Sequence, residues 1–193
     1  MVFTAKEILD IIVMSLVVGF IFMDFLIPHR IRSFRKIDFF THFFNYELFI
    51  IAILVTAPAL IFHELAHKFT AIAYGLPATF HALYFWLLIG ILLRIFHSPI
   101  IFLIPGGVSI PAAKIAPGAM LVIAFSGPAV NLALFIGATL IIKFFKDKIS
   151  QRTFAILYAT KILNMFWFVL NMLPIPPTDG YKFFSSLIKI LGI

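Results

Sequence analysis

The sequence places two histidines and a glutamate at a spacing that suits a metal ion. His63 and His67 are four positions apart, and Glu64 directly follows the first of them. On a helix, residues four apart lie on the same face, so both imidazoles can point at one cation. Glu64 is turned by about 100° around that helix, where it could take a proton from a water that the metal activates. This is the HExxH arrangement, in which the histidines bind zinc and the glutamate is the general base.

Neither chance nor a purely structural role explains this motif well. With six histidines among 193 residues, only about 0.003 chance occurrences are expected. The motif also lies within an apolar stretch, 48–74, where an unpaired carboxylate costs several kcal/mol. We therefore favour a metal site over polar residues that merely bond to neighbours in a helix.

The composition is that of an integral membrane protein. Apolar residues make up 63% of the chain, charged residues 12%, and the mean hydropathy is +1.12, whereas soluble domains have about 25% charged residues. The length allows about four or five spans of about 20 residues each. We assign the net charge of +7 to loops that orient the chain and contact the lipid bilayer, not to nucleic-acid binding. The chain has no cysteine, so zinc would need His, Asp or Glu ligands.

These properties predict an all-α polytopic membrane protein with a single domain, 1–193. We expect transmembrane helices at four places in the sequence: 8–28, 48–74, 116–145 and 154–173. A basic interfacial loop is expected over 29–47, and an Asp-Gly loop with an interfacial tail over 174–193. Asp10 and Asp24 fall near the ends of the first span, where we expect solvated carboxylates.

The region 80–112 is predicted to hold a re-entrant segment or a small membrane-embedded β-hairpin near 98–112. Two short β-prone runs flank Pro105-Gly106-Gly107, which is a turn signal; whether 80–104 spans the membrane or re-enters stays open. Non-helical backbone at this depth has to be buried or line a cavity. A hairpin beside the metal helix would offer an edge to which an extended peptide could add, so Gly106 and Gly107 are candidate substrate-binding residues.

Two later segments carry polar residues in apolar surroundings. Asn131 lies inside the 116–145 span, where it could simply bond between helices. Asn171 precedes a run of prolines that fixes an extended segment and leads to Asp179. As part of a surface turn Asp179 would be unremarkable, but the histidine pair needs a third ligand and has no other acid nearby.

Three motifs together resemble those of the site-2 protease family of intramembrane zinc metalloproteases. The matches are HELAH at 63–67 to HExxH, Ser126-Gly127-Pro128-x-x-Asn131 to SGPxxN, and Asn171-x-x-Pro174-x-Pro176-x-x-Asp179-Gly180 to NxxPxPxxDG. They occur in the family's order, and the resemblance covers roughly 48–180. Thr178 stands where the family usually has an aliphatic residue.

The resemblance implies an activity as well as roles for the motif residues. The chain would be a multi-pass zinc metalloendopeptidase of the cell membrane that cleaves a transmembrane protein substrate within or beside its membrane segments. One Zn²⁺ would be held by His63, His67 and Asp179, with Glu64 as the base. Asn131 would help to stabilise the oxyanion or bind substrate, and Asn171 would help to bind substrate.

Other functions and the orientation stay open at this point. A membrane metal-ion transporter would have repeated polar positions along several helices, and a non-catalytic membrane-binding relative would lack Glu64 or a ligand; the sequence has neither feature. The basic loops 29–47 and 143–152 fall on the face opposite the metal, which the positive-inside rule makes cytoplasmic. The resemblance instead implies a cytoplasmic active site. Substrate, activating signal and oligomeric state are not specified by the sequence.

Overall fold

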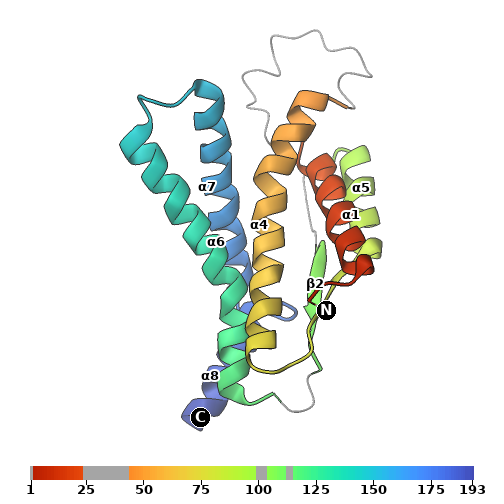
Figure 1. The fold of residues 1–193 in the computed structure, drawn as a ribbon, viewed down its shortest axis with the longest axis vertical. Coiled ribbons are helices and arrows are strands. Elements are labelled where there is room, and N and C mark those ends of the chain that lie inside the picture. The colour runs from red at the N-terminus through yellow and green to blue at the C-terminus, as the bar shows by residue number, and fades with distance from the viewer. Residues whose placement is uncertain (1, 24–43, 99–103, 112–114) are drawn as a thin grey trace.

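The computed structural model describes residues 2–23, 44–98, 104–111 and 115–193. Most of the predicted basic loop 29–47, and Asp24 with it, lies outside the described residues. In the described part, helices dominate, and they are joined by one small sheet (Figure 1).

Three long helices stand side by side. They are α4 (Tyr46–Ala73), α6 (Pro117–Phe145) and α7 (Gln151–Asn171), and each is long and apolar enough to cross a membrane. The structure is thus that of an all-α membrane protein. In Figure 1, α6 packs against both α4 and α7 and runs opposite to them. The carboxyl ends of α4 and α7 therefore lie in the same half of the molecule.

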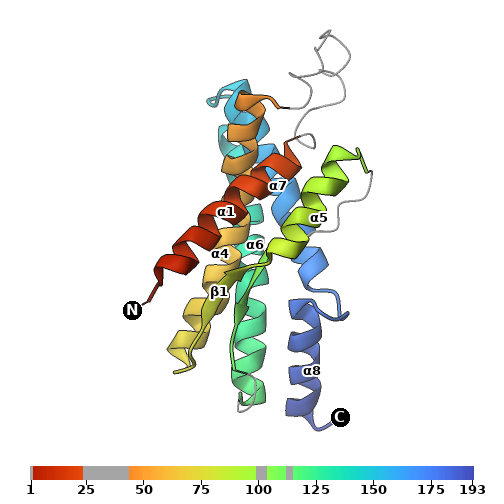
Figure 2. The ribbon, with the colours of Figure 1, turned by 90° about the vertical axis from the view of Figure 1, so that its right-hand side faces the viewer.

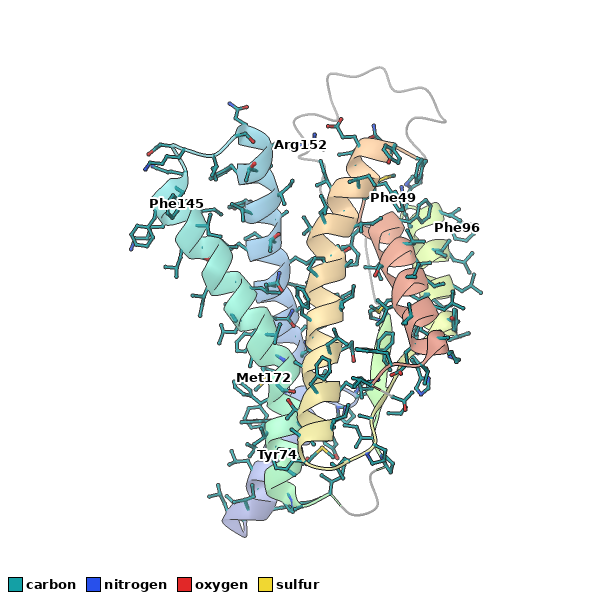
Figure 3. All side chains as sticks on the ribbon, viewed as in Figure 1. Phe49, Tyr74, Phe96, Phe145, Arg152 and Met172 are labelled. Carbon is teal, nitrogen blue, oxygen red and sulfur yellow. The ribbon has the colours of Figure 1, made fainter. Side chains whose placement is uncertain are left out.

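The side-chain view supports this arrangement of the ends. Tyr74 and Met172, which follow α4 and α7, lie in the lower half of Figure 3. Phe145 and Arg152, at the connection between α6 and α7, lie at the opposite end. A residue just beyond α7 can thus come close to the last turns of α4.

The described residues contain three candidate spans where the sequence suggested four or five. The first predicted span corresponds to α1 (Ala5–Phe22). This helix carries three charged residues, Lys6, Glu7 and Asp10, and is therefore not among the candidate membrane spans. It packs across α4 (Figure 2). Helix α5 (Tyr84–Ile95) has 12 residues, about 18 Å at 1.5 Å per residue, and is too short to cross a hydrocarbon core of about 30 Å.

The predicted β element is present, but its partner strand differs from the expected one. Strand β2 (Gly106–Ser109) pairs antiparallel with β1 (Thr79–Ala82), with α5 between them in sequence. The sequence predicted a local hairpin whose first strand would be the apolar run just before Pro105. Residues 99–103 of that run lie outside the described residues. Gly106 and Gly107 therefore belong to a strand, not to its turn.

Burial of the β1 side chains accounts for this pairing. Phe80 is 1% exposed and Ala82 6% exposed, and both pack into an apolar cluster with Met14 and Trp167. The ring of Phe80 lies so close to Gly106 that a Cβ there would be 2.9 Å from it. A glycine in β2 thus lets the aromatic residue of β1 reach the core.

Helix α8 (Asp179–Leu191) begins beside the end of α7 and packs on α6. A Cβ on Gly180 would lie 2.5 Å from the carbonyl oxygens of Met172 and Leu173. Glycine at this position therefore allows the first turn of α8 to contact the turn that follows α7. This contact fixes the location of Asp179, the first residue of α8.

Candidate metal centre

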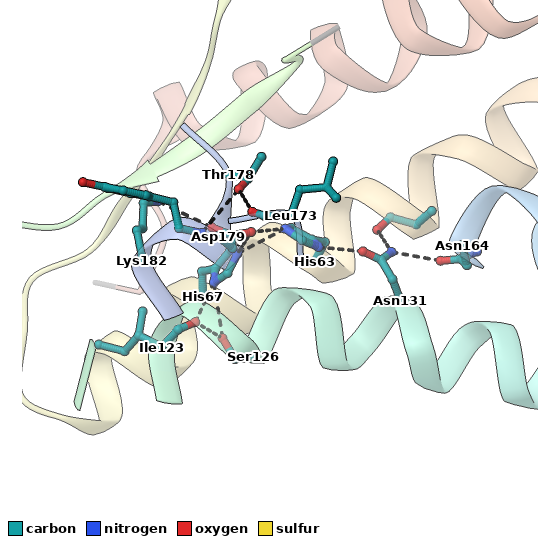
Figure 4. Close-up of polar contacts among 12 residues, drawn as sticks. His63, His67, Ile123, Ser126, Asn131, Asn164, Leu173, Thr178, Asp179 and Lys182 are labelled. Carbon is teal, nitrogen blue, oxygen red and sulfur yellow. Dashed lines mark hydrogen bonds and ion pairs between the residues drawn. The ribbon is translucent and has the colours of Figure 1, made fainter. Parts of the chain in front are cut away.

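Three potential ligand atoms converge where α4 and α8 meet. The Nε2 atoms of His63 and His67 lie 3.1 Å apart, and each lies 3.1 Å from Oδ2 of Asp179 (Figure 4). The histidines are 5% and 7% exposed, and the Asp179 side chain is 12% exposed. These three side chains form a group that could hold one metal ion.

The spacing of the three atoms fits a tetrahedral ion. Zinc bonds of about 2.0 Å to nitrogen and oxygen place neighbouring donor atoms of a tetrahedron about 3.3 Å apart. The observed separations of 3.1 Å are close to this value. The residues present therefore suit a cation with three protein ligands.

The hydrogen bonds of the two rings leave both Nε2 atoms available. The Nδ1–H of His67 donates to the carbonyl oxygen of Ile123 at 2.7 Å, and that oxygen can only accept. The Nδ1–H of His63 donates to Oδ1 of Asn131 at 2.6 Å. The Asn131 amide nitrogen donates to the carbonyl oxygen of Ala59 at 3.0 Å, which fixes its oxygen toward His63. Such partners set the tautomer and orientation of metal-ligating histidines.

The charge state of Asp179 also suits a ligand. Burial raises the pKa of this carboxyl, but its contacts with His63 and His67 lower the pKa by more, and the net value is well below the usual range. The group is therefore ionised at neutral pH, the form that binds a metal. Lys182 Nζ lies 3.5 Å from Oδ1, the carboxylate oxygen that does not face the histidines.

The segment Ser126-Gly127 explains how α6 approaches the rings. A Cβ on Gly127 would overlap Nε2 of His67 and lie 2.7 Å from Nε2 of His63. Because glycine has none, the α6 backbone can lie directly against both imidazoles. Ser126 Oγ donates to the carbonyl oxygen of Ile123 at 2.7 Å, the same oxygen that His67 uses.

Asn131 lies behind His63, and it supports that ring instead of facing the open side of the site. It is 1% exposed, and both of its amide protons are used, one by Ala59 and one by Oδ1 of Asn164 at 2.9 Å. No N–H is left for an oxyanion, so the geometry does not fit the catalytic role expected from the sequence. Its observed contacts position a ligand.

Asn164 is a polar residue of this site that the sequence reasoning missed. It is fully buried in α7, and its amide donates to the carbonyl oxygen of Thr160 at 2.8 Å while its oxygen accepts from Asn131. An amide side chain in the middle of an apolar span was the available signal. Its role depends on a neighbouring helix, which the local sequence does not identify.

Thr178 stabilises the start of the helix that carries Asp179. Its hydroxyl lies 2.5 Å and 2.8 Å from the carbonyl oxygens of Leu173 and Ile175 and accepts from the N–H of Tyr181 at 3.4 Å. Threonine is a good N-cap residue. It therefore performs a role here that the aliphatic residue expected at this position could not.

The donor group opens into a cavity of about 1300 Å³ with mainly apolar walls. Glu64 lines it beside the two histidines, and so do Asn171, Gly106 and Gly107. The structure thus brings every predicted site residue except Asn131 to the wall of one cavity.

The chain is similar over nearly its full length to a protein from an archaeon. This relative is the protein named "Putative zinc metalloprotease MJ0611" of Methanocaldococcus jannaschii, 32% identical over 184 residues, which are 93% of this chain and 84% of the relative. Neither a family model nor a solved structure matches the chain.

Gly127→Ala is expected to abolish metal binding, because the new methyl group would occupy the space of the two Nε2 atoms. Metal per chain can be measured by elemental analysis of the purified protein. Gly118→Ala is the matched control, since its Cβ would meet nothing within 4 Å on the same helix. Full metal content in Gly127→Ala would contradict the assigned site.

Asn131→Ala is expected to weaken zinc binding by about 10–100-fold, because His63 loses the acceptor that orients it. Competition with a chelator gives the affinity. Asn131→Asp keeps an acceptor for the Nδ1–H but loses the amide donors to Ala59 and Asn164, so it should lose less affinity than Asn131→Ala. Equal losses in both variants would show that orientation of His63 is not the role of this residue.

Proposed function

The chain belongs to a family of zinc metalloproteases, and from this premise we propose that it is an intramembrane protease of the site-2 type. It would hydrolyse peptide bonds within or beside the transmembrane segments of membrane proteins. The observation that carries the proposal is that the donor group of His63, His67 and Asp179 opens into an apolar cavity bordered by three helices long enough to span a membrane. We place the protein in the cell membrane as a multi-pass protein.

The residues at the donor group can perform hydrolysis. His63, His67 and Asp179 would hold one Zn²⁺, and three protein ligands leave a position open. Zinc, when bound, supplies a Lewis acid that activates water and polarises the scissile carbonyl. Glu64 lines the same cavity, where its carboxylate can accept the proton of the attacking water and deliver it to the leaving amine.

The walls of the cavity suit a substrate that is itself a membrane helix. On α4 the lining residues follow one face: Thr56, Leu60, His63, Glu64 and His67. On α7 a stripe at intervals of three and four residues lines nearly the whole helix: Phe154, Ala155, Tyr158, Ala159, Ile162, Leu163, Phe166, Trp167, Leu170 and Asn171. A substrate helix lying along α7 would reach the metal at the end of this stripe.

The outer edge of β2 can receive the substrate once its helix has unwound. Leu83 donates its N–H to the carbonyl of Pro105 at 3.0 Å, so the ladder hydrogen bonds fall on the odd-numbered residues of β1 and β2. Backbone groups of Gly106 and Val108 therefore point away from β1, and both residues line the cavity. An extended substrate segment can add there as a strand, which leaves Gly107 to pair with His81.

A metal transporter fits these observations less well. Among the residues that the structure describes, His63, His67 and Asp179 form the one group of side chains able to hold a metal ion. A transport path would need further polar sites along the membrane normal. A non-catalytic relative would have no use for an acid at the position of Glu64.

Glu64→Gln is expected to keep one zinc per chain and to lose cleavage of a reconstituted transmembrane substrate by about 100-fold or more, because the general base is removed. Products are quantified by mass spectrometry and zinc by elemental analysis. Glu47→Gln is the matched control: the same substitution on the same helix, at a largely exposed side chain. It should cleave like the parent.

Two results would contradict the proposal. Undiminished cleavage in Glu64→Gln would exclude the assigned base. Metal transport into vesicles that survives this substitution, with no proteolysis by the parent, would favour a transporter.

A further inference from the structure

Two buried acids on α1 are not used by the hydrolytic mechanism. Glu7 and Asp10 lie three positions apart, so they share one face of the helix, and they are 2% and 0% exposed. The expectation that Asp10 is a solvated carboxylate is wrong for this structure. Buried carboxylates need partners, and each of these acids has one on the sheet that borders the cavity.

The two carboxylates cap the outer edge of β1. Oε1 of Glu7 accepts from the N–H of Phe80 at 2.8 Å, and Oδ2 of Asp10 accepts from the N–H of Ala82 at 3.2 Å. Alternate residues of a strand direct their N–H groups to the same side, and a neighbouring strand would normally bond to them. The acids therefore occupy the position of a third strand beside β1. Asp10 also accepts a hydrogen bond from the Tyr84 hydroxyl at 2.6 Å.

Glu7 also connects the sheet to the metal helix. Oε1 of Glu7 also pairs with the ammonium group of Lys68, the residue directly after His67. Lys68 is 1% exposed, and its ammonium lies 4.5 Å from the centre of the Phe3 ring. One carboxylate oxygen thus contacts both β1 and the turn of α4 that carries a ligand.

A role in holding α1 in place does not account for these bonds. The helix already packs on α4 closely enough that a Cβ on Gly19 would overlap Ile53, and apolar residues such as Met14 and Val18 are fully buried. Apolar packing is often at least as stabilising as a buried ion pair. Glu7 also accepts from the N–H of Thr4 at the start of α1, and Asp10 pairs with Lys6 on the same helix. Unlike apolar residues, however, the two acids also bond to the β1 backbone and so fix its position.

We propose that Glu7 and Asp10 are positioning residues that hold the β1–β2 sheet at a set distance from the metal ligands. Within the described part of the chain, they also leave β2 as the one open edge of the sheet, so that an extended substrate adds on the cavity side. This inference rests on the proposed function. A shift of about 1 Å in the substrate can cost about 100-fold in rate, so the sheet must be held firmly.

The test uses two double variants that differ in whether the side chain at position 7 can accept hydrogen bonds, from the N–H of Phe80 and from that of Thr4 at the start of α1. Lys68→Met with Glu7→Gln leaves no unpaired buried charge. The amide oxygen of the new glutamine can still accept from the N–H of Phe80. Lys68→Met with Glu7→Leu removes that acceptor as well. The first double variant is therefore the control for the second.

Two readouts apply to the full-length, zinc-loaded protein in lipid nanodiscs. Because the chain has no cysteine, Ser109→Cys on β2 and Tyr46→Cys on α4 can carry spin labels, and pulsed EPR gives their distance distribution without any substrate. The second readout is the set of peptide bonds cleaved in a transmembrane substrate, determined by mass spectrometry. Zinc content is measured for every variant.

The parent and the Glu7→Gln control should give a narrow distance distribution and cleavage at one bond. The Glu7→Leu variant should give a broadened distribution, cleavage spread over neighbouring bonds and a kcat lower by about 100-fold, with zinc unchanged. An unchanged distribution in Glu7→Leu, or equal broadening in both double variants, would overturn the proposal.

Two further cases are distinguishable. If Glu7→Leu with Lys68→Met fails to fold, Asp10→Leu against Asp10→Asn makes the same comparison at the N–H of Ala82 without touching the Glu7–Lys68 ion pair. Both Asp10 variants lose the ion pair with Lys6 equally. If the parent cleaves no substrate, the proposed function fails, whereas the distance measurement still decides whether the acids hold the sheet.

Discussion

Polar groups in apolar surroundings have no water to bond to, so each must find its partner within the protein. This constraint accounts for the main long-range polar contacts of the described residues. His63 reaches Asn131 on α6, and Asn131 in turn reaches Asn164 on α7. Glu7 on α1 reaches Lys68 on α4. The four helices are thus held in register by a few buried hydrogen bonds, and apolar packing fills the space between them.

Features that depend on local periodicity could be predicted from the sequence. The i, i+4 spacing of His63 and His67 places both rings on one face wherever a helix forms, and long apolar runs predict the helices themselves. The opposite directions of α6 and α7 follow from their short connection. The common direction of α4 and α7 follows because one ends near the histidine pair and the other ends just before Asp179. Asp179 could be nominated because a third ligand was needed and the prolines before it fix an extended path, but its distance to the rings required coordinates.

Features that depend on distant partners could not be predicted. Strand pairing is non-local, so nothing near Gly106 identifies Thr79–Ala82 as its partner. The apolar run before Pro105 was the better local candidate. Asp10 near a helix end is equally compatible with solvent and with a buried N–H group, and the choice depends on where β1 lies. Asn131 could face substrate or a ligand, and only the positions of Ala59 and Asn164 decide between them.

The separation of the ligands along the chain has a consequence for biosynthesis. Asp179 follows His67 by 112 positions, and Gly127, against which both rings pack, lies between them. During translation, the two imidazoles enter the bilayer long before the carboxylate emerges from the ribosome. A nascent chain that ends before α8 offers the cation only two donors. Zinc capture, and any capacity to damage neighbouring proteins, is therefore deferred until the last ligand has been synthesised and docked.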